Sequence, residues 1–188
     1  MFSIKGQPTF LKEHENIQTF NAIKIPTLET IYFKNWESDG HQRAIIITKE
    51  LDGYLPLSCN EYQFGSIFVS TKQKKLALFE RLAKLMRMMH TNDFQHDCFY
   101  LKHVFAKTIG DDFDLRVIDL EKARKRWSKK SIVFRDLYTL SRHAPQWGVR
   151  DQLRFYRIYM NEVKLTPKSK RLWRELSKKN KKKSKPIL

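Results

Sequence analysis

The sequence predicts an α+β fold in which β-rich segments come first and helices dominate the carboxyl side. Three observations lead to this prediction. Two pairs of β-rich runs, each interrupted by a turn signal, lie before residue 120. A long helical pattern separates these pairs, and three further helical patterns follow residue 131. Strands that give way to a run of helices are typical of α+β domains.

The first element in the chain is a helix expected at residues 9–22, before Pro26 ends it. Thr9 follows Pro8 and is the candidate N-cap, because its hydroxyl can accept a bond from a free backbone N–H of the first turn. Apolar residues in this segment and directly after it recur at helical spacing: Phe10, Ile17, Phe20 and Ile23. That spacing indicates a helix with one face turned toward a core.

The β-rich runs predict two antiparallel pairs. A Ser-Asp-Gly turn at 38–40 separates the runs of the first pair, and Gly110-Asp111-Asp112 separates those of the second. The first pair consists of residues 31–33 and 44–48, and the second of residues 104–105 and 115–118. Runs rich in Ile, Val, Phe and Tyr that flank such turns are typical of antiparallel strands.

The remaining periodic segments predict helices. Residues 71–90 carry a stripe of apolar residues at helical spacing: Leu76, Phe79, Leu82, Ala83, Met86 and Met89. We interpret this stripe as core packing rather than as a ligand site. Three more helices are expected, at residues 132–143, 151–161 and 169–177. After them Lys178–Lys183 is expected to leave the helix and to be solvated and mobile, because like charges repel one another.

Length and composition restrict the class of protein. The 188 residues suffice for one domain with a core, and a formal charge of +17 predicts binding to polyanions. Two cysteines, Cys59 and Cys98, are too few for a disulfide framework and favour a reducing compartment. The first six residues have no secretory h-region, and no apolar run approaches the roughly 20 residues that cross a bilayer. A cytoplasmic protein is expected.

The positive charge is concentrated at the carboxyl end. Residues 164–188 hold eleven Lys and Arg against Glu175 alone, a balance of +10. Three interpretations remain open: a solvated end, contact with anionic lipid, or nucleic-acid binding. Nucleic acid is the least favoured, because the tryptophans are not interleaved with the basic residues as a stacking platform requires: Trp127, Trp147 and Trp173.

Polar residues gather in the stretch 95–105, and Asp119 follows the next apolar run. Two strand ends that deliver polar groups to one place can form a cleft for charged chemistry, in which Asp119 is either a catalytic residue or a turn-capping residue. His96, His103 and Cys98 are alternative candidates for zinc ligands, but their spacing matches no usual zinc pattern. Cys98 as a nucleophile has no partner beyond these histidines.

The motif His96-(x)3-Tyr100-(x)2-His103-Val104-Phe105, followed by Ile118-Asp119-Leu120-Glu121-Lys122-Ala123-Arg124, resembles the lipopolysaccharide kinase (Kdo/WaaP-like) family. The resemblance is strongest to its InaA-type branch and extends over residues 7–160. It implies a protein-kinase-like fold, with a truncated small β lobe plus one helix and a mainly helical large lobe. The implied divisions are a small-lobe remnant and hinge at 1–53, a helical catalytic-type lobe at 54–163, and a basic helix with a disordered tail at 164–188.

The resemblance also implies an ATP site and Mg²⁺. Glu13 matches the glutamate that pairs with a phosphate-binding lysine, and Glu50 and Leu51 match the hinge around adenine. Asp119 matches the metal-binding aspartate of the kinase Asp-Phe-Gly motif. Carboxylates that bind Mg²⁺ against phosphates are central to phosphoryl transfer.

Within the implied catalytic loop, His96 and His103 align with the first and last residues of the kinase His-Arg-Asp-(x)4-Asn motif. This alignment puts Cys98 at the catalytic aspartate, with Asp97 one residue earlier. His96 is expected to support the loop rather than act as a base. Asp136 either supports the loop from the following helix or begins a solvated face.

Two functions follow from the resemblance. The first is ATP-dependent phosphorylation of a Kdo or heptose hydroxyl in the lipopolysaccharide inner core, at the cytoplasmic face of the inner membrane. There basic residues such as Lys122 would attract acceptor phosphates, and the basic tail would contact anionic lipid. The alternative is a kinase-fold pseudoenzyme that acts by binding, because only twelve residues precede Glu13 and a glycine-rich loop with its lysine is not among them.

Overall fold

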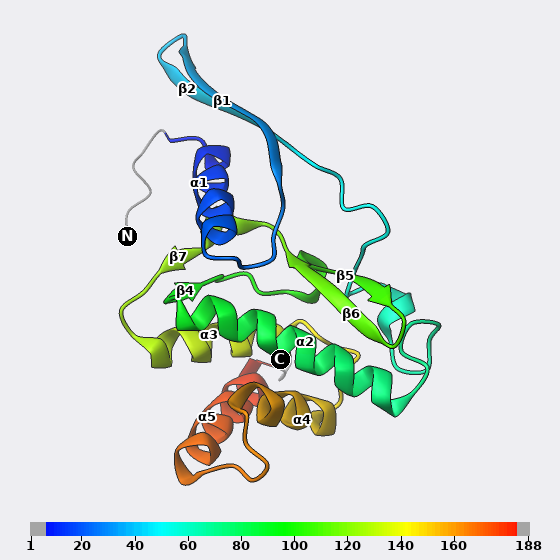
Figure 1. Cartoon of the computed structure of the whole chain (residues 1–188). Helices are drawn as coiled ribbons and strands as arrows, with labels where there is room; N and C mark the ends of the chain where they lie inside the picture. Colours follow the sequence, from blue (N-terminus) through cyan, green and yellow to red (C-terminus); the bar gives the residue numbers. More distant parts are fainter. Residues whose placement is uncertain (1–6, 184–188) are drawn as a thin grey trace, which may run out of the picture.

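The structure is a computed structural model that describes residues 7–183, with side chains described through Asn180. Figure 1 shows three levels: a helix and a hairpin at the top, a small central sheet, and a group of helices below. The order of helices, strands and then helices matches the predicted α+β class.

The first helix, α1 (Thr9–Ala22), has the predicted bounds. The predicted N-cap is wrong, because the cap position is Pro8 and makes no side-chain bond, so that Thr9 already lies within the helix. Ile17 and Phe20 are fully buried. This face of α1 therefore packs on the rest of the molecule, as its apolar spacing predicts.

The hairpin formed by β1 (Thr30–Ser38) and β2 (His41–Thr48) confirms the first strand pair. Its inner face packs on α1, where the rings of His14 and Phe33 stack with centroids 3.9 Å apart. Its outer face exposes large apolar side chains at 39 to 48%: Tyr32, Trp36, Ile45 and Ile47. In Figure 1 the hairpin projects away from the other elements.

The central sheet has the strand order β3-β5-β6. Its main pair, β5 (Val104–Ile109) and β6 (Asp112–Val117), is antiparallel and confirms the second predicted pair. One face, with Val104 opposite Val117 and Ala106 opposite Leu115, is buried. Three two-residue strands were not predicted: β3 (Leu55–Pro56), β4 (Phe94–Gln95) and β7 (Arg124–Lys125). Two residues are too short to show an alternating pattern.

The helices of the carboxyl side are α2 (Lys72–Thr91), α3 (Lys129–Arg142), α4 (Val149–Met160) and α5 (Pro167–Lys183). Side-chain caps begin three of them: Thr71 accepts a bond from the N–H of Lys74, Ser128 from that of Ser131, and Thr166 from that of Ser169. The α2 stripe is core packing, as interpreted, since Leu82, Ala83, Met86 and Met89 are fully buried. One-turn 3₁₀ segments lie at Asn60–Tyr62, Leu101–His103 and Leu120–Lys122.

The carboxyl-terminal helix is longer than predicted. The expectation that Lys178–Lys183 leaves the helix is wrong, because α5 continues to Lys183. Lys179 lies 4.2 Å from the ring centroid of Tyr138, and Asn180 Nδ2 donates to Ser141 Oγ at 2.8 Å. These contacts with α3 stabilise the last turns against charge repulsion. The expected tail at 184–188 lies outside the described residues, and the divisions after residues 53 and 163 stay predictions.

Candidate functional site

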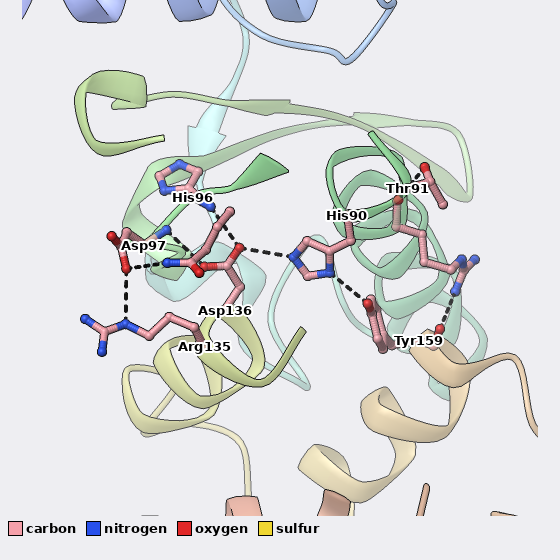
Figure 2. Close-up of polar contacts among 9 residues, drawn as sticks. His90, Thr91, His96, Asp97, Arg135, Asp136 and Tyr159 are labelled. Atoms are coloured by element: carbon pink, nitrogen blue, oxygen red, sulfur yellow. Dashed lines mark hydrogen bonds and ion pairs between the residues drawn. The ribbon is translucent and has the colours of Figure 1, made fainter. Parts of the chain in front are cut away.

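A buried carboxylate positions the loop that contains the candidate catalytic residues (Figure 2). Asp136 comes from α3 and is fully buried. Its Oδ1 accepts the backbone N–H of Asp97 at 3.0 Å, and its Oδ2 accepts that of His96 at 2.9 Å. Of the two alternatives for Asp136, support of the loop is therefore the observed one. A buried carboxylate with several donors fixes the backbone it contacts.

His90 extends this network into α4. Its Nε2 lies 3.0 Å from Asp136 Oδ2, and its Nδ1 lies 2.7 Å from the hydroxyl of Tyr159. Because the carboxylate can only accept, Nε2 donates to Asp136, and Nδ1 forms a hydrogen bond with the Tyr159 hydroxyl. His90 is thus a buried histidine with both nitrogens satisfied.

His96 connects the loop to the segment that precedes Asp119. The ring is fully buried, and its Nε2 donates to the carbonyl of Ile118 at 3.0 Å. Burial lowers the pKa of His96 below its usual range, so the ring stays neutral. A buried neutral ring bonded to a backbone carbonyl supports the loop, in line with the role expected from the sequence.

Asp97 is surrounded by donors. Its Oδ1 accepts from Gln95 Nε2 at 2.7 Å and from Arg135 Nε at 3.1 Å, and its Oδ2 is ion-paired with Arg124. The pairing of β4 with β7 places Arg124 opposite Gln95 and so beside this carboxylate. The backbone of Asp97 has a positive φ of 69°. Both oxygens of Asp97 are therefore already engaged in the folded chain.

Asp119 and His103 lie together at the end of the central sheet. Asp119 has a left-handed backbone, with φ 60° and ψ 56°, two residues after β6 ends at Val117. Its Oδ2 is 3.0 Å from His103 Nδ1, which also lies 2.9 Å from the carbonyl of Cys98. The Asp119 side chain is 32% exposed. Left-handed backbone at a non-glycine residue is costly and gathers at functional sites.

Glu13 reaches the same place from α1. Burial raises the pKa of Glu13, and the nearby Asp119 raises it further, against the effect of a hydrogen bond from the backbone of Leu120. Asn16, one turn along α1, donates to the carbonyls of Leu120 and Ala123 at 2.6 and 2.8 Å. Helix α1 is thus bonded to the chain directly after Asp119. Among the described residues, no cation is ion-paired with Glu13.

Tyr100 and Lys122 neighbour the thiol of Cys98, and of the two only Lys122 has a role predicted from the sequence. Burial raises the pKa of the Tyr100 hydroxyl, and contact with Cys98 raises it further. The pKa of Lys122 is raised by its bond to Glu121, 3.2 Å away, and next by Cys98. Tyr100 belongs to the sequence motif and lies three residues before His103. Its place in the motif could therefore have indicated that it belongs to the site.

The predicted hinge residues lie on another segment. Glu50 is exposed and Leu51 half-buried, with the carbonyl of Leu51 accepting from the N–H of Tyr54 at 3.1 Å. The carbonyl of the following residue, Asp52, accepts a hydrogen bond from Lys107 Nζ at 3.2 Å. In the described part of the chain, no hydrogen bond joins Glu50 or Leu51 to the loop of His96 and Asp97.

The donor set suits a hard cation better than zinc. The carboxylate oxygens of Asp119, with Glu13 beside it, are the ligand type that Mg²⁺ prefers, and Mg²⁺ often binds one or two carboxylates plus substrate phosphates. His103 is engaged by Asp119 and the Cys98 carbonyl. Within residues 7–180, no group of three or more His, Cys, Asp or Glu is arranged to bind a metal.

Comparisons with known proteins agree with one another. The model of the lipopolysaccharide kinase (Kdo/WaaP) family matches residues 1–159. Protein InaA of Escherichia coli K12 is 22% identical over 138 residues, which are 73% of this chain and 63% of InaA. The lipopolysaccharide core heptose(I) kinase WaaP of Pseudomonas aeruginosa is 30% identical over 161 residues, 79% of this chain and 58% of that kinase.

Among solved structures, WaaP in complex with acyl carrier protein superposes with a TM-score of 0.75 and 25% identity, over 93% of this chain and 76% of that chain. This match supports a kinase-like fold. The chain spans about three fifths of the length of the two curated relatives. Within residues 7–183, no helix has the length and apolar character to cross a bilayer.

Proposed function

This chain belongs to the lipopolysaccharide kinase (Kdo/WaaP) family, and we propose that it transfers the γ-phosphoryl group of ATP to a Kdo or heptose hydroxyl of the lipopolysaccharide inner core. The observation that carries this proposal is the geometry of Asp119. It is a partly exposed carboxylate at a strand end, in left-handed backbone, beside His103 and Glu13. Such a carboxylate suits Mg²⁺ against phosphates.

The proposed residues have separate roles. Asp119 would hold Mg²⁺, which supplies charge neutralisation to the phosphates. His103 orients the Asp119 carboxylate, and His96 and Asp136 fix the loop. Glu50 and Leu51 remain the proposed adenine contacts. Glu13 is proposed to pair with a phosphate-binding lysine. Lys122, exposed beside Glu121, would attract acceptor phosphates.

As the oxygen of the acceptor hydroxyl bonds to phosphorus and the bond to ADP breaks, the proton of that hydroxyl passes to the transferred phosphoryl group or to solvent. Asp97 or Cys98 is proposed to orient this hydroxyl. The guanidinium groups on Asp97 favour Cys98, whose thiol adjoins Tyr100. A thiol with a reference pKa of about 8.5 is a poorer hydrogen-bond acceptor than a carboxylate, and general-base catalysis contributes about 10²–10⁴ in rate. Slow turnover is therefore expected.

The second candidate function is that of a pseudoenzyme, a kinase-fold protein that acts by binding. Two observations favour it: both oxygens of Asp97 are engaged, and Glu13 has no cationic partner among the described residues. For either function we propose a cytoplasmic location with contact to the anionic inner membrane through the basic carboxyl end. Nucleic acid is not a proposed partner.

A nucleotide titration tests the kinase proposal. The melting temperature of the full chain is measured with and without millimolar Mg·ATP, for wild type, Asp119→Asn and the exposed control Asp39→Asn. A nucleotide-dependent rise is expected in wild type and Asp39→Asn but not in Asp119→Asn, because ligands stabilise the state they bind. The rise, rather than the melting temperature, is compared, since Asp119→Asn also changes the contact with His103.

A transfer assay separates the two functions. Labelled ATP is incubated with a Kdo-containing inner-core acceptor, and label on the sugar is measured. Nucleotide binding with transfer supports the kinase, and binding without transfer supports the pseudoenzyme. The absence of any rise at millimolar Mg·ATP would overturn the kinase proposal.

A further inference from the structure

An open cavity lies on the helical side of the molecule, with His90 and Tyr159 among its lining residues. Its volume is about 380 Å³, and it is formed by the end of α2, the first turns of α3, the end of α4 and the start of α5. Three apolar side chains line it, and all three pack against the core: Val133, Met160 and Leu172. Its size falls within the range of about 300–1,000 Å³ that is usual for small-ligand pockets.

The charged groups of this cavity are all cationic. Four cationic side chains line it and no acidic one does: Arg87, Lys129, Lys130 and Lys168. Lys129 and Lys130 are paired with Asp93 and Glu175 outside the cavity, at 3.4 and 3.6 Å, and these exposed pairs are weak. Lys168 has no ion pair with any described residue. The rim can therefore accept an anion without breaking a buried ion pair.

The inner end of the cavity is polar and leads to the loop. Tyr159 and His90 form this end, and their bond continues to Asp136 and from there to the backbone of His96 and Asp97. Figure 2 shows Asp136 between the loop on one side and His90 with Tyr159 on the other. Arg87, on the same wall, donates to the carbonyls of Ile158 and Tyr159 at 2.8 and 3.2 Å, which fixes the end of α4.

We propose that this cavity binds an anionic amphiphile, a molecule with one alkyl or acyl chain and a phosphate or carboxylate headgroup. The chain would lie against Val133, Met160 and Leu172, and the headgroup would contact Lys168 and its neighbours on the rim. The site is separate from Asp119 and does not depend on phosphoryl transfer. A bound ligand touches Tyr159 and His90, and so contacts the network that positions the catalytic-type loop.

Calorimetric titration of the full chain with dodecyl phosphate, below its critical micelle concentration, tests the chemistry of the ligand. Saturable binding of one molecule per chain is expected. Two arms separate the parts of the ligand: inorganic phosphate carries only the charge, and dodecyl maltoside carries only the chain. Each is expected to bind at least tenfold more weakly. The proposal would be overturned if either control bound as tightly as dodecyl phosphate, or if dodecyl phosphate did not bind.

Two lysines of α5 provide a matched pair for locating the site. Lys168 lines the cavity, whereas Lys170 is exposed on the same helix and does not. Lys168→Glu is expected to weaken dodecyl phosphate binding at least tenfold, and Lys170→Glu less than twofold. Equal losses in the two variants would mean general attraction to a basic surface, which would contradict the assignment. Both positions are exposed, so both variants should fold.

The ring of His90 reports occupancy directly. Its NMR signals are expected to shift as dodecyl phosphate is added, followed by the amide signals of His96 and Asp97 that Asp136 contacts. Val133→Trp, which fills the cavity, should abolish the shift in a protein whose circular dichroism is unchanged. Saturable binding that leaves the His90 ring signals in place would put the ligand elsewhere and refute the site.

Discussion

At the scale of single residues, Asp136 has the largest predicted effect on stability. Its buried carboxylate accepts from His90 and from two backbone N–H groups. Asp136→Ala would leave these three donors without a partner, and each buried donor left unsatisfied costs about 1–3 kcal/mol. Urea denaturation should show this loss. The control Asp111→Ala, at a side chain that is 94% exposed, should change the unfolding free energy by less than about 0.5 kcal/mol.

A loss below about 1 kcal/mol in Asp136→Ala would contradict this account. Asp136→Asn is a further test, because an amide oxygen can still accept one backbone N–H while its amino group faces the other donors. Its loss should lie between those of the alanine variant and wild type.

His96 predicts a dependence of stability on pH. Burial lowers its pKa in the folded state, against the opposing pull of Asp136 and Asp119, so the unfolded chain binds the proton more readily. Stability is therefore complete above the unfolded pKa of about 6.5 and is lost as pH falls below it, by at most about 1.4 kcal/mol per pH unit. His96→Gln, which keeps a donor toward Ile118, should flatten this slope. An identical slope in the two proteins between pH 6.5 and 5 would argue against a buried neutral His96.

At the scale of elements, the hairpin separates inward from outward residues. Ile46 on β2 packs against the core, whereas Ile47, its neighbour, is 48% exposed on the outer face. Ile46→Ala should cost about 2 kcal/mol, because it leaves a partly filled cavity against α1, and Ile47→Ala about 0.5 kcal/mol or less. Thermal unfolding of the two variants measures the difference. Equal losses would mean that both faces are covered in solution.

The longer elements were predictable from sequence because their periodicity is local. The bounds of α1, the α2 stripe and both main strand pairs follow from apolar spacing and turn residues. The pairing of β4 with β7 does not, since two-residue strands have no period. That pairing brings Arg124 to Asp97 from 27 residues away, and Arg135 arrives from 38 residues away.

The candidate site was predictable to the same degree. Local motif spacing indicated His96, His103 and Asp119, which the structure places around one loop and strand end. The partners of Asp97 depend on tertiary contacts and could not be read from the motif. Similarly, the extension of α5 depends on contacts of Lys179 and Asn180 with α3. The run of lysines in the sequence gives no indication of these tertiary contacts.

At the scale of the whole molecule, the charge of +17 is distributed unevenly, with +10 of it in residues 164–188. Because α5 extends to Lys183, much of this charge stands on an ordered helix rather than on a solvated tail. The exposed basic side chains Lys170, Arg174 and Lys178 can be changed without disturbing the contacts of Lys179 with α3. They therefore allow a test of the proposed membrane contact that does not unfold the helix.

The triple variant Lys170→Gln, Arg174→Gln, Lys178→Gln should bind vesicles of anionic lipid more weakly than wild type. Each basic residue near such a surface contributes about 1 kcal/mol, so the loss can reach about a hundredfold when all three engage. The control Lys34→Gln, Arg43→Gln, Lys49→Gln removes the same charge from exposed positions on or beside the hairpin. Co-sedimentation at rising salt measures both. Because the two variants have the same net charge, equal weakening would mean attraction by total charge, whereas a selective loss in the first would mean that α5 faces the membrane.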